Sequence, residues 1–244
     1  MHTILLIGGQ SSRFNDSNYD YNMKAKSLSL INKEELINYV LANFVKHDFK
    51  NFVLPLGHYK EEFLNHFNKL KNINGIECKL TLNSEEYLKL CRTNQKQINI
   101  FIFDAGCKVN KAERILKVIK KLSIDEFLVS YGDAIGNINL KKVFKLHNNS
   151  KCYVTGVGKI MRSQYGHYSI NKKKLVIAIN EKPIIEDLVN IGYFFFKKDA
   201  IKYFFKLKKS DLENGIIKKL IKNNKVQIYE HKKFWKSVDT FKDL

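Results

Sequence analysis

The sequence predicts an α/β fold built on a Rossmann-like, doubly wound, mixed but mostly parallel sheet, and three observations lead to this prediction. Short apolar runs alternate with amphipathic stretches through the first 149 residues, which is the pattern of repeated β-α-β units. The chain of 244 residues is 44% hydrophobic, which is enough for a sizeable core. It contains only Pro55 and Pro183 and no Pro-, Gly- or Ser-rich linker, so we expect one domain over residues 1–244.

The elements of the first half follow from apolar periodicity. Residues Thr3–Ile7 form an apolar run typical of a buried strand. Residues Glu34–His47 repeat apolar side chains at helical spacing and therefore predict a helix. The same reasoning predicts strands at Phe52–Leu56, Ile76–Leu82, Ile98–Phe103 and Phe127–Ser130, and helices at Tyr59–Phe67 and Ala112–Leu122.

The pattern changes after Asn149, where several strand-like segments follow one another before the next helix. Strands are expected at Tyr153–Val157, Tyr165–Ile170, Leu175–Asn180, Asn190–Phe196 and Val226–His231, and helices at Ala200–Phe205 and Leu212–Lys222. This half continues the first without a break, so we treat residues 1–149 and 150–244 as two halves of one domain.

The net charge of +19 is a feature of many nucleic-acid-binding proteins. However, four of the 43 basic residues are arginine, and the lysines are spread along the chain. Dedicated DNA or RNA binders more often use arginine for bidentate contacts. We therefore expect no nucleic-acid partner and interpret the charge as a solvated surface that attracts anionic substrates. A charge-driven nucleic-acid binder is the alternative from another class of protein.

The sequence also bears on the compartment. No apolar run approaches the roughly 20 residues of a membrane-spanning helix, and the first residues lack the pattern of a signal peptide. Cys78, Cys91, Cys107 and Cys152 are scattered without metal-ligand spacing, which is typical of reduced thiols. We expect a cytoplasmic protein with no membrane partner.

The stretch LLIGGQSSRF (Leu5–Phe14) ends the first predicted strand at two glycines. Ligands of parallel sheets bind beyond the carboxyl ends of the strands. Glycines let the backbone approach a ligand, successive N–H groups can hold an anion, and Arg13 adds a positive charge. The stretch matches neither the Walker A motif nor the dinucleotide fingerprint, so a structural turn is equally open.

Three further motifs carry charged residues. Asp133 follows a predicted strand in Tyr131-Gly132-Asp133, where it could hold a divalent cation or cap a turn. Asp239 follows an aromatic segment near the end of the chain. The third motif, Glu181-Lys182-Pro183, is by itself typical of a surface ion pair.

Taken in order, the motifs resemble those of the sugar-nucleotide pyrophosphorylases, and among these the glucose-1-phosphate cytidylyltransferases. That family has G-G-x-G-T-R, K-P, T-Y-G-D-G, E-K-P, N-G-G-F-F and H-x-G-F-W-x-x-M-D-T. The corresponding segments here are GGQSSR (Gly8–Arg13), KS (Lys26-Ser27), SYGDA (Ser130–Ala134), EKP (Glu181–Pro183), NIGYF (Asn190–Phe194) and HKKFWKSVDT (His231–Thr240). Asp104–Ile115 also aligns with D-T-G-x-x-T-M-T-G-G-R-I. The resemblance spans almost the whole chain and implies a nucleotidyltransferase (GT-A-like) fold.

The resemblance implies a cytidylyltransferase that joins CMP from CTP to a phosphorylated acceptor and releases pyrophosphate. Such a reaction depends on positioning and on charge neutralisation. Arg13 and Lys26 would be catalytic, and Asp133 and Asp239 would hold Mg²⁺, for which Mn²⁺ can substitute. The first half would bind the nucleotide through Ile7, Gly8, Gly9, Gln10, Ser11, Ser12, Arg13, Lys26, Asp104, Gly106, Arg114 and Gly132. The second half would bind the acceptor through Gly166, Glu181, Lys182, Asn190, Gly192 and Glu213.

The sequence departs from the family mainly on the acceptor side. Val109–Glu113 replaces T-M-T-G-G, Asn190-Ile191-Gly192 replaces Asn-Gly-Gly, and Ser11 replaces the third glycine of the first loop. Two acceptor classes stay open. One is a sugar 1-phosphate, with CTP, UTP or GTP as donor. The other is the phosphoramidate of phosphoglutamine, as in the CTP:phosphoglutamine cytidylyltransferase branch. We expect a role in the synthesis of capsule or other surface polysaccharide.

Overall fold

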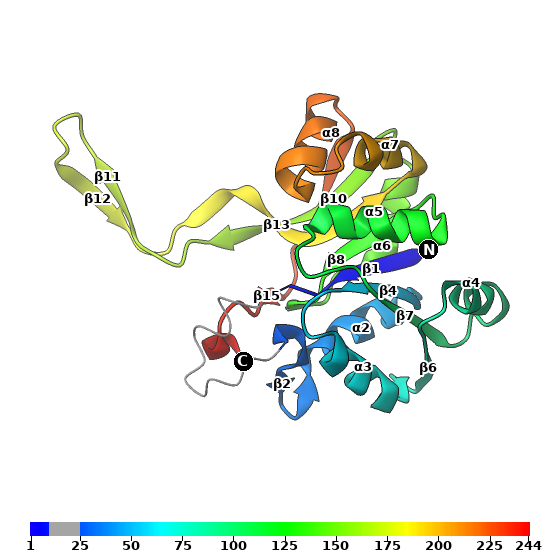
Figure 1. Cartoon of the computed structure of the whole chain (residues 1–244). Helices are drawn as coiled ribbons and strands as arrows, with labels where there is room; N and C mark the ends of the chain where they lie inside the picture. The colour runs from blue at the N-terminus through cyan, green and yellow to red at the C-terminus, as the bar shows by residue number, and fades with distance from the viewer. Residues whose placement is uncertain (10–24) are drawn as a thin grey trace.

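A nine-stranded mixed sheet forms the centre of the computed structural model, which describes residues 1–9 and 25–244 (Figure 1). The strand order is β14-β10-β13-β8-β1-β4-β7-β6-β5. The strands are β1 (His2–Leu6), β4 (Asn51–Leu56), β5 (Asn72–Ile73), β6 (Ile76–Thr81), β7 (Ile98–Asp104), β8 (Phe127–Tyr131), β10 (Val154–Arg162), β13 (Ile184–Phe196) and β14 (Val226–Glu230). β13 runs antiparallel to both β8 and β10, and β5 runs antiparallel to β6, whereas the other five pairings are parallel. The predicted α/β fold with a mostly parallel sheet is confirmed.

Helices cover both faces of this sheet, and each face has its own buried core. α2 (Leu36–Lys46), α3 (Lys60–Lys69) and α6 (Leu140–Asn148) pack on one face. α4 (Ser84–Thr93), α5 (Lys111–Leu122), α7 (Lys198–Lys206), the π-helix η2 (Leu212–Ile217) and α8 (Lys218–Lys222) pack on the other. Figure 1 shows α5, α7 and α8 on the opposite side of the sheet from α2 and α3. None of the helices in the described part of the chain is long and apolar enough to cross a membrane.

Local chemistry explains why these elements form where they do. Ile4 and Leu5 of β1 are both fully buried, one in each core, as expected for a parallel strand covered on two faces. α5 begins with a capping box in which Asn110 and Glu113 each bond the other's backbone N–H. Ile115 and Leu122 lie on the buried face of the same helix.

The sequence analysis missed α4 and α6. Of the ten residues of α4 only Tyr87 is buried, so the apolar periodicity of this helix is weak, and the local signal is the N-cap Asn83. α6 is likewise capped by Asn139, and it buries Leu140 and His147. In both cases the capping side chain was the available signal, and the apolar run after it was too short to predict a helix.

Short elements complete the fold. Two ladders lie beside the main sheet, β2 (Leu30–Ile31) with β3 (Glu34–Glu35) and β9 (Ala134–Gly136) with β15 (Trp235–Ser237), and two 3₁₀ turns are η1 (Lys26–Leu28) and η3 (Phe241–Asp243). The outer parts of β10 and β13 continue into the hairpin of β11 (His167–Ile170) and β12 (Val176–Asn180). We call residues 159–189 the arm, because Figure 1 shows this segment projecting away from the sheet and its helices. β13 begins at Ile184, six residues before the predicted Asn190, because its first half pairs with β10 along the arm.

His147 predicts a pH dependence of folding. Its ring is fully buried in the core, with Nδ1 2.9 Å from the hydroxyl of Thr155, and burial, aided by the charge of Lys197, lowers its pKa to about 4. Between about pH 6.5 and pH 4 the unfolded chain therefore takes up a proton that the folded chain does not. The free energy of unfolding should fall as the pH falls through this window, by up to about 3 kcal/mol from this group, and should not change on its account above the window.

Urea unfolding at several pH values from 7 to 4 measures this dependence. A His147→Gln variant should show a shallower loss of stability between pH 6.5 and pH 4 than the parent protein. Equal slopes for the two proteins would contradict the assignment.

Candidate active site

The carboxyl ends of β1, β4 and β8 meet at one edge of the sheet, and a cavity of about 510 Å³ lies there. Parallel strands bring their carboxyl ends to the same edge, so residues that follow different strands come together. The cavity is lined by the residues that follow these strands, by the start of α5 and by the residue before η2. They are Leu6, Gly8, Gly9, His58, Cys107, Val109, Asn110, Lys111, Arg114, Tyr131, Asp133 and Asp211.

Gly8 lies directly against a buried guanidinium. A Cβ atom on Gly8 would be 2.6 Å from Nη1 of Arg114 and 2.8 Å from the backbone nitrogen of Gly57. Nη1 of Arg114 donates a hydrogen bond to the carbonyl of Pro55 over 2.9 Å. Burial lowers the pKa of Arg114, but an arginine keeps its charge at neutral pH. The cavity therefore has a fixed positive charge beneath the loop that follows the first strand.

Asp104 and Gly106 shape the loop that leads to α5. The carboxylate of Asp104 accepts a hydrogen bond from the N–H of Gly106 over 2.8 Å and lies 3.8 Å from the ammonium of Lys60. Gly106 has a φ of +92°, a backbone conformation that residues with a side chain rarely adopt. These two predicted nucleotide residues hold the backbone of the loop, and the adjacent Cys107 lines the cavity.

Two carboxylates from distant parts of the chain meet at one lysine. Nζ of Lys26 lies 2.8 Å from Oδ2 of Asp133 and 3.7 Å from Oδ1 of Asp239. Asp239 reaches this place because β15 pairs with β9 and because the N–H of Val238 donates to the carbonyl of Asp133 over 2.8 Å. Lys26 is held by its neighbour Ser27, whose hydroxyl donates to the carbonyl of Gly132 over 2.7 Å.

The packing at Gly132 excludes a side chain. A Cβ atom there would lie 2.1 Å from Cγ2 of Ile7, so β1 and the loop after β8 are in direct contact. This contact places the residues that follow β1 next to Asp133. Ile7 and Gly132 were both predicted to bind the nucleotide. In the structure they pack closely against each other.

The donor set suits a hard divalent cation that is shared with a ligand. Among the described residues, no group of three or more His, Cys, Asp or Glu side chains is arranged to hold a metal ion. Mg²⁺ is commonly bound by one or two carboxylates together with phosphate oxygens of a substrate. Asp133 and Asp239 provide two carboxylates, and their side chains are 34% and 44% exposed. They fit an ion that completes its coordination with a bound phosphate.

A network around Tyr131 closes the other side of the cavity. Tyr131 and Lys111 both donate short hydrogen bonds to one carboxylate oxygen of Glu213, and Nζ of Lys111 lies 5.0 Å from the centre of the Tyr131 ring. Burial, and then the bond to Glu213, raises the pKa of Tyr131 well above its usual value. Gly192 has a φ of +84°, and a Cβ atom on it would be 2.7 Å from the Tyr131 ring. Oδ1 of Asn190 accepts a hydrogen bond from the N–H of Gly192 over 2.9 Å.

Asp211 adds a second negative group beside this network. Burial acts to raise its pKa, but bonds from the N–H groups of Asn214 and Glu213 and the charge of Lys111 together hold the pKa below its usual value. Asp211 is therefore ionised at neutral pH and faces the cavity beside a lysine.

The predicted acceptor residues fall into two groups. Glu213 and Gly192 contact Tyr131, which lines the cavity, and Asn190 accepts a hydrogen bond from the N–H of Gly192. The other three, Gly166, Glu181 and Lys182, lie on the arm, where Lys182 has a φ of +47° and a carboxylate oxygen of Glu181 lies 2.6 Å from the Cβ position of Gly166. The structure does not place these three among the residues that line the cavity.

Four predicted residues, Gln10, Ser11, Ser12 and Arg13, lie outside the described residues. The structure adds cavity residues to which the sequence analysis assigned no role, namely Leu6, His58, Cys107, Val109, Asn110, Lys111, Tyr131 and Asp211. Tyr131 could have been found, because it stands in the SYGDA motif at the end of a strand. His58 follows β4 in the same way, whereas Lys111 and Asp211 carry no sequence signal of their own.

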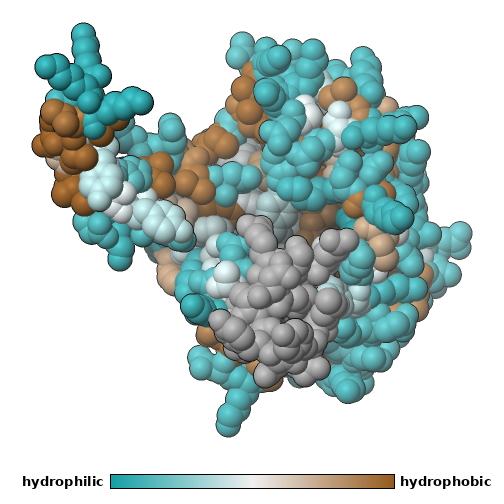
Figure 2. Space-filling model, turned by 60° about the vertical axis from the view of Figure 1, so that its left-hand side comes forward, coloured by the Kyte–Doolittle hydropathy of each residue, from teal (hydrophilic) through white to brown (hydrophobic). Residues whose placement is uncertain are grey.

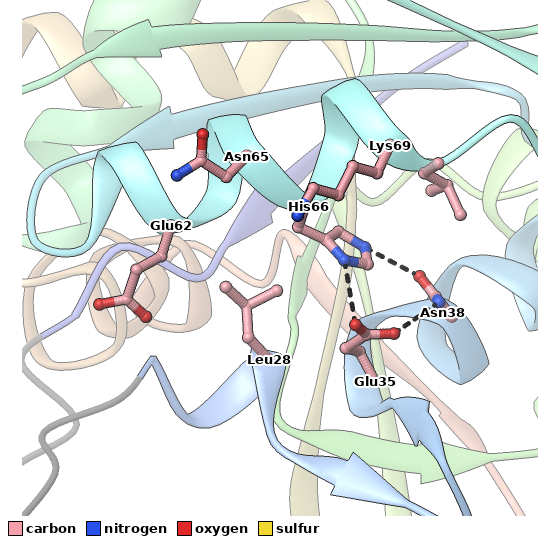
Figure 3. Close-up of a pocket in the computed structure, with 8 residues that line it drawn as sticks. Leu28, Glu35, Asn38, Glu62, Asn65, His66 and Lys69 are labelled. Carbon is pink, nitrogen blue, oxygen red and sulfur yellow. Dashed lines mark hydrogen bonds and ion pairs between the residues drawn. The ribbon is translucent and has the colours of Figure 1, made fainter.

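A second cavity, of about 460 Å³, lies between α2 and α3 (Figure 3). The ring of His66 stands between Glu35, 3.5 Å from Nδ1, and Asn38, 3.0 Å from Nε2. The carboxylate of Glu62 accepts the N–H of Ala25 over 3.3 Å. None of the predicted site residues lines this cavity, so we assign the chemistry to the first.

Comparisons with known proteins show the family and the fold. A family model described as "Nucleotidyl transferase" matches residues 2–244. A Bacillus subtilis protein named "Probable glucose-1-phosphate cytidylyltransferase" is 25% identical over 246 residues, which cover 100% of this chain and 93% of that protein. The glucose-1-phosphate cytidylyltransferase of Salmonella typhimurium is 21% identical over 248 residues, with the same coverage. A solved structure titled as the inositol-1-phosphate CTP transferase from T. maritima has a TM-score of 0.65 at 15% identity, covering 100% of this chain and 91% of that one, and so shares the fold.

The two glycines after β1 make a matched pair of substitutions. Gly8→Ala should lower the free energy of unfolding by about 1–3 kcal/mol, because its Cβ would displace Arg114 or the backbone of Gly57. Gly9→Ala should change it by no more than about 0.5 kcal/mol, because no atom of the described residues 1–9 and 25–244 lies within 4 Å of the new Cβ. Denaturant unfolding of both variants checks the packing of this loop, and equal losses would contradict it.

Proposed function

Because the chain belongs to the nucleotidyl transferase family, we propose that it transfers CMP from CTP to a small phosphorylated metabolite and releases pyrophosphate. The observation that carries this proposal is the meeting of Lys26 with Asp133 and Asp239 beside the cavity at the end of β1. CTP as the donor is supported by the relatives named as glucose-1-phosphate cytidylyltransferases.

The reaction is an in-line displacement at phosphorus. An oxygen of the acceptor's phosphate forms a bond to the α-phosphorus of CTP while the bond from that phosphorus to the bridging oxygen of the β-phosphate breaks, and pyrophosphate leaves with the electron pair. No side chain needs to remove a proton, since the attacking oxygen is already an anion. Positioning and charge neutralisation are the tasks left to the protein.

The described residues can perform these tasks. Gly8 and Gly9 line the cavity at the end of β1, and backbone N–H groups of such a loop can bind a phosphate. Lys26 provides an ammonium for the α-phosphate, where charge develops during transfer. Arg114 provides a buried positive charge beneath the nucleotide, and Arg13 is proposed to contact the departing phosphates.

Asp133 and Asp239 are the proposed ligands of Mg²⁺, and Mn²⁺ is expected to substitute. When bound, the ion would neutralise phosphate oxygens of CTP and of the acceptor. Lys26 contacts both carboxylates, and this meeting of an ammonium group with two carboxylates supports the proposed phosphate and metal roles.

The acceptor is proposed to lie toward Tyr131, where Asn190, Gly192 and Glu213 gather. Two acceptor classes fit the departures from the family pattern, a sugar 1-phosphate and a phosphoglutamine-type phosphoramidate. Lys182 and Glu181 would hold the acceptor's phosphate and orient it, which requires the arm to approach the cavity when the acceptor binds. For either acceptor, the proposed role is in the synthesis of capsule or other surface polysaccharide.

The proposed cytoplasmic location has support from the cysteines. Cys78, Cys91, Cys107 and Cys152 are all free thiols, as expected in a reducing compartment. CTP and phosphorylated metabolites are available there. The excess of lysine over acidic residues would draw such anions toward the surface.

A substrate panel tests the function. The protein should release pyrophosphate from CTP in the presence of Mg²⁺ and one of glucose 1-phosphate, inositol 1-phosphate or phosphoglutamine, and more slowly or not at all from UTP, GTP or dTTP. Silence with every pair of nucleotide and acceptor would contradict the proposal. Tight and steeply salt-dependent binding to DNA or RNA, together with that silence, would favour the nucleic-acid alternative.

The carboxylate pair has its own test. Asp133→Asn and Asp239→Asn should each lower turnover by on the order of 10²-fold or more, because each removes a metal ligand at the point of charge development. Asp125→Asn is the matched control, since Asp125 pairs with Lys198 on the surface, and it should keep near-normal turnover. Circular dichroism should show that all three variants fold. Near-normal turnover in both site variants would remove these carboxylates from the metal site.

A further inference from the structure

His58 lines the cavity of the candidate active site, but its side chain has no part in the reaction described above. Its Nε2 atom is buried and has no hydrogen-bond partner among the residues that the structure describes. A neutral imidazole has a donor on one nitrogen and an acceptor on the other, so this atom can bond either kind of group. A buried polar atom without a partner is costly, and it therefore favours a ligand that supplies the partner.

The backbone on both sides of His58 is fixed by packing. A Cβ atom on Gly57 would be 2.7 Å from Nη2 of Arg114 and 2.7 Å from the carbonyl oxygen of Gly106. Tyr59 has a φ of +58°, a conformation that a residue with a side chain keeps only where its surroundings hold it. The ring of His58 can nevertheless turn about χ2, whose preferences are broad. A bound group can thus meet Nε2 without a change of the backbone.

The place of His58 along the sheet edge indicates which substrate it meets. β8, β1 and β4 are neighbours in the sheet, and Asp133, Gly8 and His58 each come two residues after the end of one of them. Neighbouring strands are about 4.8 Å apart, so the backbone of His58 lies roughly 10 Å from that of Asp133. Tyr131 and Asn190, where the acceptor is proposed to lie, belong to β8 and to β13 on its other side. His58 is therefore placed to meet the donor nucleotide.

The part of the cavity near His58 suits the uncharged portion of a nucleotide. The other lining residues that follow β1 and β7 have no acidic or basic side chain up to the start of α5, and they are Gly8, Gly9, Cys107, Val109 and Asn110. The guanidinium of Arg114 lies against Gly8 and donates to the carbonyls of Pro55 and Val109. A triphosphate needs cations, whereas a base or a ribose needs a close neutral surface and a few polar groups. The portion that fits here is the nucleoside.

We propose that His58 binds the nucleoside of the donor, through a hydrogen bond between Nε2 and either the base or the 2′-hydroxyl of the ribose. This inference rests on the proposed function, since the cavity must bind a nucleoside triphosphate. Because burial has already removed Nε2 from water in the free chain, forming the bond carries little further desolvation cost on the protein side. His58 then contributes to the affinity for the nucleotide and takes no part in the chemistry at phosphorus.

Calorimetric titration of the whole chain with CTP and Mg²⁺ tests the bond. His58→Leu fills the space without a polar atom and should weaken the binding of CTP by about 10-fold, the usual effect of losing one such hydrogen bond. His58→Gln carries an amide that can reach the place of Nε2 and should bind CTP within about threefold of the parent protein. His47→Ala is the matched control, because His47 follows α2 and does not line the cavity, and it should bind CTP as the parent does.

Two further measurements separate a nucleoside contact from a structural role. Inorganic triphosphate has no nucleoside, so His58→Leu should bind it as tightly as the parent protein does. The substitution also removes a buried polar atom that has no partner among the described residues, so the free energy of unfolding in urea should stay the same or rise. A residue that only held the loop in place would, when replaced, lower both the stability and the affinity for inorganic triphosphate.

Titration with dCTP distinguishes the two partners within the nucleoside. If Nε2 bonds the 2′-hydroxyl, the parent protein should bind dCTP about 10-fold more weakly than CTP, and His58→Leu should bind the two equally. If Nε2 bonds the base, the ratio of the two affinities should be the same in the parent and in His58→Leu.

Three results would overturn the assignment of His58. The first is a parent protein that binds CTP no more tightly than His58→Leu does, which would leave the proposed function intact. The second is an equal loss of affinity for CTP and for inorganic triphosphate in His58→Leu, which would make the residue structural. The third is a parent protein that binds no nucleoside triphosphate at all, which would overturn the proposed function as well.

Discussion

The parallel pairing of β1 with β8 is the constraint on which the rest of the site depends. Its register places Leu6 opposite Tyr131, so the residues that follow both strands emerge at the same point of the sheet edge. Gly8 and Asp133 then both line the cavity. Gly132 must lack a side chain because Ile7 occupies the space that its Cβ would need. A shift of this register by one residue would turn both loops to opposite faces of the sheet.

Charge is arranged around this edge so that each ionised group has a partner before any ligand arrives. Lys26 offsets the repulsion between Asp133 and Asp239, which lie more than 100 residues apart in sequence. Arg114 is buried, but a backbone carbonyl accepts from it and Asp104 stabilises its charge. Lys111 and Tyr131, which also line the cavity, both donate hydrogen bonds to Glu213. A cavity lined in this way favours an anionic ligand that brings its own cation.

Large apolar side chains are buried in the central sheet and its helices, which we call the body, but are exposed on the arm, as the brown side chains in Figure 2 show. In the body, helices cover both faces of the sheet, and the side chains of Phe44 and Phe127 are fully buried. On the arm, Tyr168 and Ile179 lie in solvent at more than half of their full exposure. The sequence pattern is similar in both places, since the alternation that predicts a half-buried strand does not say which layer covers the apolar face. The covering layer is decided by how distant elements pack.

Much of the fold and part of the site could be predicted from local sequence. The spacing of apolar residues indicates whether a segment is a strand or a helix and which of its faces is buried, because this spacing is a local property. Thr3–Ile7 and Glu34–His47 are examples. For the same reason, Gly8 and Asp133 could be placed at strand ends. α4 was not predicted because its apolar residues show only weak helical periodicity, since only Tyr87 of this helix is buried.

The sequence by itself determined the alternation of strands and helices, the mostly parallel sheet and the strand-end positions of the first loop and of Asp133. Only the tertiary structure decided that Asp239 meets Lys26, that Arg114 lies beneath Gly8, and that Glu181 and Lys182 stand on an arm away from the cavity. The physical reason is the range of the interactions. Propensity, capping and periodicity act over a few residues, whereas the partner of a buried charge or of an apolar face is chosen by how distant elements pack.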